Sequence, residues 1–222
     1  MLYRGERHLI QETEKIPMDR EEKKTYDFER IEALIEEGGG LVKTGDILAL
    51  GIDYRRILKF TEEGLLHRVK SGYYSLGRGG YSEVEMLSAM FPDGVLTLEA
   101  GLYAQGYLSV KPSHWCIAIS KNTSKSRFAI DYPVLVPYYS TDEVLSLGVE
   151  EKTFDGVSMK VYTIDRLICD VLKYEERMEH EDFRKAVLAY IADRKKDVEK
   201  LTSYAEKRKV SRKVKDMIGV WL

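Results

Sequence analysis

The stretch from Leu41 to Leu76 constrains the fold of this chain more than any other. Apolar residues at helical spacing predict two short helices, separated at Gly51 because glycine readily adopts the left-handed conformation that ends a helix. Thr44 is expected to cap the first helix and Asp53 the second. Two short strands are then predicted at residues 66–69 and 73–76, with a turn at residues 70–72 between them.

The polar faces of the second helix and of the hairpin are basic, which suits a DNA duplex. A helix, a turn, a second helix and a basic hairpin follow one another as in a winged helix-turn-helix. Such a helix fits the major groove, and the hairpin can reach phosphates. The alternative is a small helical domain that packs against another protein. The candidate DNA-binding residues are Lys43, Thr44, Tyr54, Arg55, Arg56, Lys59, His67, Arg68, Lys70 and Arg78.

Composition limits the broad class of the protein. Of the 222 residues, 44% are hydrophobic and 32% are charged, as in ordinary globular domains. The net charge of −2 means that any nucleic-acid-binding surface must be local. The sequence has neither a signal peptide nor an apolar run long enough to span a membrane, so we expect a cytoplasmic protein with no membrane partner.

The sequence predicts an α+β protein in three parts. Residues 1–26 form an N-terminal arm, and residues 27–80 form the winged domain, with a supporting helix at 28–37. The glycine-rich segment 77–81 is the candidate hinge. Residues 81–222 form a mixed α/β domain that ends in a helical bundle.

Periodicity and turn signals place the elements of this larger domain. Asp155-Gly156 is typical of a type I′ hairpin turn, and Ser82 with Glu85 of a capping box. Strands are predicted at 114–120, 127–130, 134–139, 149–154 and 157–162. Helices are predicted at 84–91, 98–105, 141–147, from 164 onward, and at 183–191, 198–205 and 210–221.

The C-terminal helices carry a local surplus of positive charge. Residues 193–217 contain ten Lys or Arg and five Asp or Glu. This pattern indicates either a solvated helical surface or a second contact with nucleic acid or an acidic partner. The candidate residues of this secondary basic surface are Lys195, Lys196, Lys207, Arg208, Lys209, Arg212 and Lys213.

Residues that could support catalysis or bind metal form no recognisable motif. Cys116 and Cys169 lie far apart and outside any CxxC pair, and the four histidines lack ligand spacing. We therefore expect no metal, no cofactor and no catalytic residues. One alternative is a nuclease-like carboxylate cluster on the sheet, with Asp131, Glu151 and Lys152 as its residues.

Four segments together resemble the AbiEi-like antitoxins of type IV (abortive infection) toxin–antitoxin systems. These segments are GLLHRVKSGYYSL, YYSTDEVLSLGVE, FDGVSMKVY and TIDRLICDVLKY. The most specific pieces are the wing ending in Gly72, Tyr73 and Tyr74, and the helix with Arg166, Cys169 and Asp170. The resemblance runs from about Phe28 to the C-terminus.

The resemblance implies an N-terminal winged helix-turn-helix and a larger C-terminal antitoxin domain. It also implies a repressor that binds inverted repeats of double-stranded DNA in its own promoter. Binding to paired repeats is compatible with a homo-oligomer on the DNA. Its functional partner would be a nucleotidyltransferase-like toxin, without need of a stable complex. Two alternatives remain, namely a regulator whose second domain senses a ligand or oligomerises, and a nuclease-like enzyme with a DNA-binding module.

Overall fold

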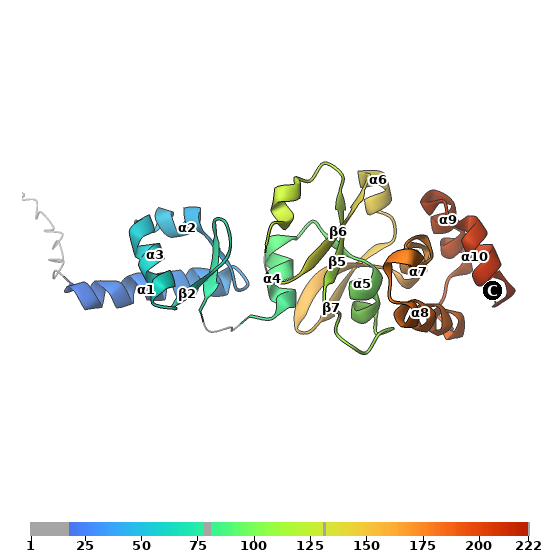
Figure 1. Cartoon of the computed structure of the whole chain (residues 1–222), viewed down its shortest axis with the longest axis horizontal. Helices are drawn as coiled ribbons and strands as arrows, with labels where there is room; N and C mark the ends of the chain where they lie inside the picture. The colour runs from blue at the N-terminus through green and yellow to red at the C-terminus, as the bar shows by residue number, and fades with distance from the viewer. Residues whose placement is uncertain (1–17, 78–80, 131, 222) are drawn as a thin grey trace, which may run out of the picture.

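The computed structural model describes residues 18–77, 81–130 and 132–221, whose elements form two lobes along the long axis of the molecule (Figure 1). We call residues 20–77 the N-lobe and residues 81–221 the C-lobe. The N-lobe contains a three-stranded sheet and the C-lobe a five-stranded sheet, and each has a hydrophobic cluster. The α+β class expected from the sequence is confirmed.

Helix α1 spans Arg20–Glu37 and begins well before the predicted start at residue 28. A capping box fixes this start, because the Asp19 carboxylate accepts the backbone N–H of Glu22 while the Glu22 carboxylate accepts the N–H of Asp19. The prediction of a helix over residues 28–37 alone is therefore wrong, and residues 20–26 of the expected arm are helical. The apolar periodicity did not indicate the helix over residues 20–26, because the buried residues of α1, from Asp27 to Ile35, lie in its later part.

The rest of the N-lobe follows the predicted order with one added strand. Its elements are β1 (Val42–Lys43), α2 (Thr44–Ala49), α3 (Tyr54–Glu62), β2 (Leu66–Lys70) and β3 (Tyr73–Leu76). The strands pair antiparallel in the order β1-β3-β2. Strand β1 is too short to show a periodic pattern, and its pairing with β3 could not be predicted from local sequence.

The helix boundaries test the predicted caps. The Asp53 carboxylate accepts a backbone N–H in the first turn of α3 at 2.8 Å, as predicted. Gly51 has a φ of 78°, which is the left-handed conformation expected there. The prediction that Thr44 caps α2 is wrong, because Thr44 is the first helical residue and Lys43 takes the cap position without a side-chain bond. The Thr44 N–H instead donates to the Gly72 carbonyl in the hairpin turn.

The N-lobe core holds α3 against α1. Phe60 is fully buried, and its ring meets Phe28 edge-to-face with the centroids 5.4 Å apart. This packing leaves the opposite face of α3 to solvent. The buried hydrophobic residues of the cluster are Ile31, Ile35, Val42, Ile47, Ile52, Ile57, Phe60, Leu66 and Tyr74.

The C-lobe sheet has the order β6-β5-β4-β8-β7. Its strands are β4 (Val95–Leu96), β5 (Trp115–Ser120), β6 (Leu135–Ser140), β7 (Val149–Phe154) and β8 (Val157–Tyr162). Strand β4 was not predicted, yet it occupies the centre, antiparallel to β5 and parallel to β8. The β7–β8 hairpin is confirmed, and Asp155 and Gly156 both have positive φ, as a type I′ turn requires.

The predicted strand at residues 127–130 is wrong. A 3-10 helix, η1 (Lys125–Phe128), occupies this segment. The Arg127 guanidinium donates to the Asp93 carboxylate and, at 2.9 Å, to the Met90 carbonyl. These side-chain bonds fasten the segment to the end of α4, so its backbone does not join the sheet.

Helices cover the sheet and form the end of the C-lobe (Figure 1). They are α4 (Glu83–Met90), α5 (Leu98–Gln105), α6 (Asp142–Leu145), α7 (Ile164–Lys173), α8 (His180–Ala192), α9 (Val198–Arg208) and α10 (Ser211–Met217), with short 3-10 turns η2 (Glu175–Arg177) and η3 (Gly219–Trp221). The Ser82–Glu85 capping box of α4 is confirmed. The terminal helical bundle is also confirmed. No helix within the described ranges is both long and apolar enough to cross a membrane.

The two lobes contact each other through the hairpin side of the N-lobe. Leu41 and Val69 belong to the hydrophobic cluster of the C-lobe, and Tyr81 packs against both clusters. The Lys70 ammonium donates to the Arg127 carbonyl at 3.4 Å. The predicted hinge falls largely outside the described residues.

Candidate nucleic-acid interface

Helix α3 presents a mixed polar and apolar face to solvent. Tyr54, Arg55 and Leu58 are exposed, whereas Ile57 and Phe60 are fully buried in the N-lobe core. Because α3 packs through one stripe, its opposite side chains are free to approach a partner. Among the residues that the structure describes, Arg55 has no ion pair.

Arg56 and Lys59 are partly engaged within the N-lobe. The Arg56 Nε atom lies 3.4 Å from the Asp27 carboxylate of α1, and the guanidinium lies over the Phe60 ring. The Lys59 Nζ atom lies 3.7 Å from the Glu63 carboxylate. Arg56 therefore ties α3 to α1, and Arg55 is the more available of these two neighbouring arginines.

A hollow of about 230 Å³ lies beside the first turn of α3. It is lined by Arg20, Asp53, Arg55, Arg56 and Lys59. The Asp53 carboxylate caps α3, so the hollow is predominantly cationic. Sequence reasoning missed Arg20, which it assigned to the arm. The capping signal of Asp19 and Glu22 could have located the start of α1.

The hairpin exposes two consecutive residues, His67 and Arg68. Strand residues normally alternate between faces, but a β-bulge between Arg68 and Lys70 breaks the register of β2. Val69 is thereby turned into the C-lobe cluster. Lys43 is also exposed, on β1 at the other side of β3.

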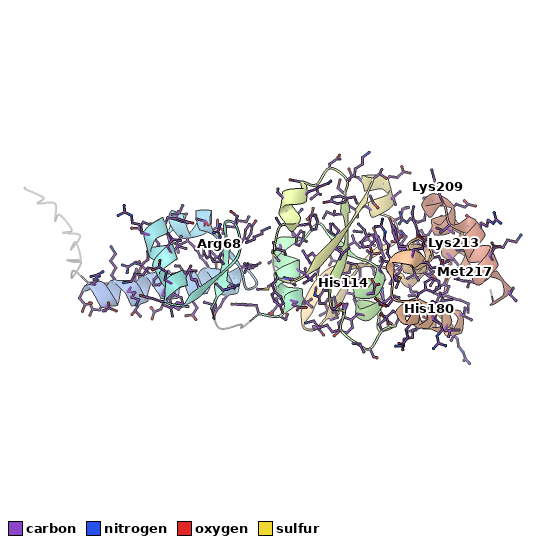
Figure 2. All side chains as sticks on the ribbon, in the orientation of Figure 1. Arg68, His114, His180, Lys209, Lys213 and Met217 are labelled. Atoms are coloured by element: carbon purple, nitrogen blue, oxygen red, sulfur yellow. The ribbon has the colours of Figure 1, made fainter. Side chains whose placement is uncertain are left out.

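The exposed residues of α3 and of the hairpin adjoin each other. The pKa of the Tyr74 phenol is raised, first by burial and then by the neighbouring Tyr54, while the charge of Arg68 acts in the opposite direction. Arg68 is also directly opposite Tyr74 in the β2–β3 ladder. Arg68 lies on β2, in the N-lobe (Figure 2).

Lys70 lies against the C-lobe. Its ammonium lies 4.4 Å from the centroid of the Tyr73 ring as well as near the Arg127 carbonyl. Burial, followed by the charges of Arg127 and Lys43, lowers the pKa of Lys70. Of the other predicted contacts, Thr44 is half-buried beside the hairpin turn, and Arg78 lies outside the described residues.

The secondary basic surface loses several of its predicted members. Arg208 is 5% exposed and pairs with Asp170, so its assignment to a surface is wrong. Lys196 donates to the Ile191 carbonyl at the end of α8, and Lys213 to the Leu172 carbonyl at the end of α7. Helix C-termini leave carbonyls without partners, which explains why cations turn inward here.

The remaining cations of this region are remote from the hairpin. Lys195, Lys207, Lys209 and Arg212 are exposed. Lys209 and Lys213 lie at the end of the molecule far from Arg68 (Figure 2). The two predicted basic regions therefore do not form one continuous surface.

The nuclease-like cluster receives little support from the described residues. Glu151 is exposed on β7, and the Lys152 ammonium donates to the Gln105 side chain at 2.8 Å. Neighbouring residues of a strand point to opposite faces, which separates these two. Asp131 lies outside the described ranges. Glu151 belongs to no cluster of three metal-ligating side chains within those ranges.

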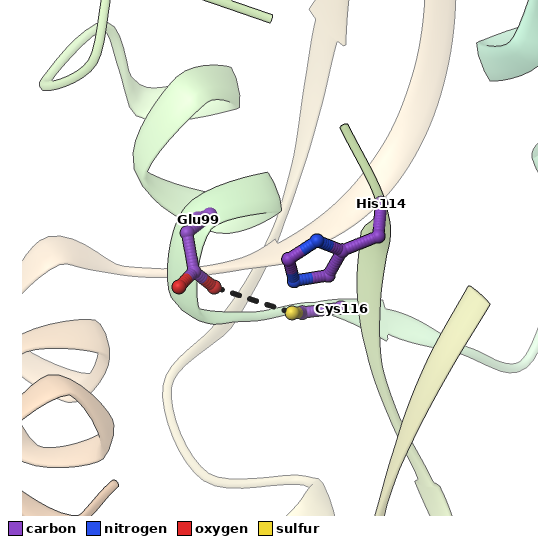
Figure 3. Close-up of side chains that lie close together, drawn as sticks. All are labelled: Glu99, His114 and Cys116. Atoms are coloured by element: carbon purple, nitrogen blue, oxygen red, sulfur yellow. Dashed lines mark hydrogen bonds between the residues drawn. The ribbon is translucent and has the colours of Figure 1, made fainter. Parts of the chain in front are cut away.

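A different set of candidate ligands does come together, contrary to the expectation from spacing. The ligand atoms of Glu99, His114 and Cys116 all lie within 4.8 Å of one another (Figure 3). His114 directly precedes β5, and Cys116 is the second residue of that strand, so the two side chains lie on the same side of the chain. The His-x-Cys spacing was the available signal. Glu99 could not be predicted, because α5 supplies it from a distant position.

A comparison with known families matches part of the N-lobe. Residues 29–77 match the model of a family described as transcriptional regulator, AbiEi antitoxin. No curated protein matches the chain. The match begins within α1 and ends just after β3, so it covers the exposed face of α3 and the hairpin. Over residues 29–77, the chain is thus similar to the AbiEi antitoxins, and the resemblance found in its sequence is confirmed there.

Proposed function

We propose that the N-lobe is a winged helix-turn-helix and that the protein is a sequence-specific DNA-binding repressor. The main support is that the family match covers α3 and the hairpin, and that both of these elements carry exposed cations. Helix α3 would enter the major groove with Arg55 toward base edges. Arg68, His67 and Lys43 would contact phosphates, and the hollow beside Arg20 would hold another phosphate.

We further propose that the protein is the antitoxin of a type IV system. It would repress its own operon at inverted repeats and counteract a nucleotidyltransferase-like toxin without requiring a stable complex. The family description, which pairs regulator with antitoxin, supports this proposal. The C-lobe lies outside the matched residues and would carry the antitoxin activity without catalysis.

Two assays on the full-length protein test these proposals together. A gel shift measures binding to the DNA of its own promoter. A growth assay measures rescue of cells that express the neighbouring gene of the operon, which the proposal takes to encode the toxin. The proposed function requires both. Binding without rescue would favour a regulator unrelated to toxins, and metal-dependent DNA cleavage by the purified protein would establish a nuclease.

One observation favours ligand sensing as a second candidate function. A C-lobe pocket of about 380 Å³ includes Tyr107, Pro112, Glu179 and Lys185 in its lining. This volume lies within the usual range of small-molecule sites. An operator affinity that changes when a small molecule occupies this pocket would support that role.

Replacing Arg55 with alanine is expected to weaken operator binding by about 1–3 kcal/mol and to relax specificity at one base pair. The reason is that Arg55 is exposed on α3 and can reach a base edge in the major groove. Gel shifts on the operator and on single-base variants measure both effects. Arg184→Ala, which removes an exposed arginine from α8, is the matched control. Unchanged affinity and specificity in Arg55→Ala would contradict the assignment.

Replacing Arg68 with alanine is expected to weaken specific and non-specific DNA binding alike. Loss of one phosphate contact should reduce the slope of log affinity against log salt concentration by about one unit. Lys70→Ala is the matched control, because Lys70 faces the C-lobe and should leave this slope unchanged. If the slope falls in Lys70→Ala but not in Arg68→Ala, then Lys70, beside the hairpin turn, makes the phosphate contact instead of Arg68.

A further inference from the structure

We propose that Glu99, His114 and Cys116 bind one zinc-class divalent transition-metal ion, whose fourth coordination position opens to the C-lobe pocket. Carboxylate, imidazole and thiolate are all ligands that Zn²⁺ accepts. The site lies in the C-lobe, and the inference does not depend on the proposed DNA binding. Figure 3 shows the three side chains converging from α5, from the residue before β5 and from β5 itself.

The distance between the Cys116 and Glu99 ligand atoms fits a tetrahedral ion. Zinc–sulfur and zinc–oxygen bonds of about 2.3 and 2.0 Å place two such ligand atoms about 3.5 Å apart. The Cys116 Sγ and Glu99 Oε2 atoms lie 3.3 Å apart. Nδ1 of His114 lies 3.3 Å from the Ser113 hydroxyl, which leaves Nε2 for the ion. An outer hydrogen bond of this kind orients a metal-binding imidazole.

The charge of the cluster also favours a cation. Glu99 is 6% exposed, and within the described residues its carboxylate has no ion pair with Lys or Arg. A buried carboxylate without a counter-ion is costly, and a divalent ion would offset this cost. Binding would convert the thiol to a thiolate and release its proton to solvent.

The fourth position would face solvent rather than the core. Glu99 and His114 line the 380 Å³ pocket, whereas Cys116 lies fully buried behind them. Three protein ligands and one open position characterise zinc sites that hold water or an exogenous ligand. The ion would therefore accept a water molecule or a small ligand with an oxygen or nitrogen donor.

Titration of the full-length protein with Co²⁺, followed by Zn²⁺, tests this proposal. We expect one equivalent of Co²⁺ to bind with a thiolate-to-metal charge-transfer absorption and release of one proton, and Zn²⁺ to displace it. Cys116→Ser should abolish the absorption. Cys169→Ser is the matched control, because that second buried thiol donates only to backbone carbonyls, and it should retain the absorption.

His114→Ala provides a second variant, since His114 is only half-buried and its loss should leave the fold intact. Metal affinity should fall at least about tenfold in this variant. The proposal is overturned if the wild-type protein gives no charge-transfer absorption, or if Cys116→Ser keeps it. Wild-type affinity in a folded His114→Ala protein would overturn it equally.

Discussion

Replacing Asp170 with alanine is expected to destabilise the C-lobe by about 3–5 kcal/mol. The buried Asp170 carboxylate accepts hydrogen bonds from Arg208 Nε at 2.7 Å and from the Thr97 hydroxyl at 3.1 Å. It also lies 2.6 Å from the fully buried guanidinium of Arg166. Alanine would leave two buried cations without this counter-charge. Urea unfolding monitored by tryptophan fluorescence reports the loss, because Trp115 is buried in the C-lobe and residues 1–80 contain no tryptophan.

A surface ion pair provides the control for this prediction. Glu181 is exposed, and its carboxylate lies 2.8 Å from the Lys185 ammonium. Solvent screens exposed pairs of this kind, so Glu181→Ala should leave the unfolding midpoint nearly unchanged. Equal midpoints for the two variants would show that the Asp170 carboxylate does not hold the C-terminal helices together.

Replacing Phe60 with alanine is expected to destabilise the N-lobe by about 3–5 kcal/mol. Phe60 is fully buried between α3 and α1, so its removal leaves a cavity under the helix proposed to read DNA. Hydrogen exchange followed by mass spectrometry should show lost protection in α1 and α3. Operator binding should fall with it, whereas tryptophan fluorescence should report a C-lobe that unfolds as in the wild type.

Leu58→Ala is the matched control for stability. Leu58 lies on the same helix and is 42% exposed, so its truncation should change N-lobe stability by no more than about 0.5 kcal/mol. Protection factors in Phe60→Ala that equal those in Leu58→Ala would contradict the described packing. Combined loss of both lobes in Phe60→Ala would instead show that the lobes unfold as one unit.

Local chemistry was sufficient to predict many elements. Asp53 caps α3, Gly51 adopts positive φ, and the Asp155-Gly156 turn joins β7 to β8, all as their sequence context indicated. Each of these signals depends on a few consecutive residues. Elements set by distant partners were missed. Strand β4 exists because β5 and β8 flank it, and η1 replaces a strand because Arg127 binds the end of α4.

The candidate site divides in the same way. The sequence indicates which residues of α3 and the hairpin are basic, but it does not indicate which cations are engaged elsewhere. Arg56 contacts Asp27, Lys70 contacts the C-lobe, and Arg208 is buried with Asp170. Charge patterns along a chain give no information on these long-range partners. The grouping of Glu99 with His114 and Cys116 depends on tertiary packing for the same reason.

The central position of β4 has a consequence for the order of folding during synthesis. Leu96 pairs with Val161, so the middle of the C-lobe sheet cannot close until translation has passed β8. At about 5–20 residues per second, the ribosome needs roughly 3–13 s to go from Leu96 to Val161. During this interval, β4 lacks the strand that flanks it on one side in the finished sheet. Every new molecule therefore carries an unpaired strand edge while it is still attached to the ribosome.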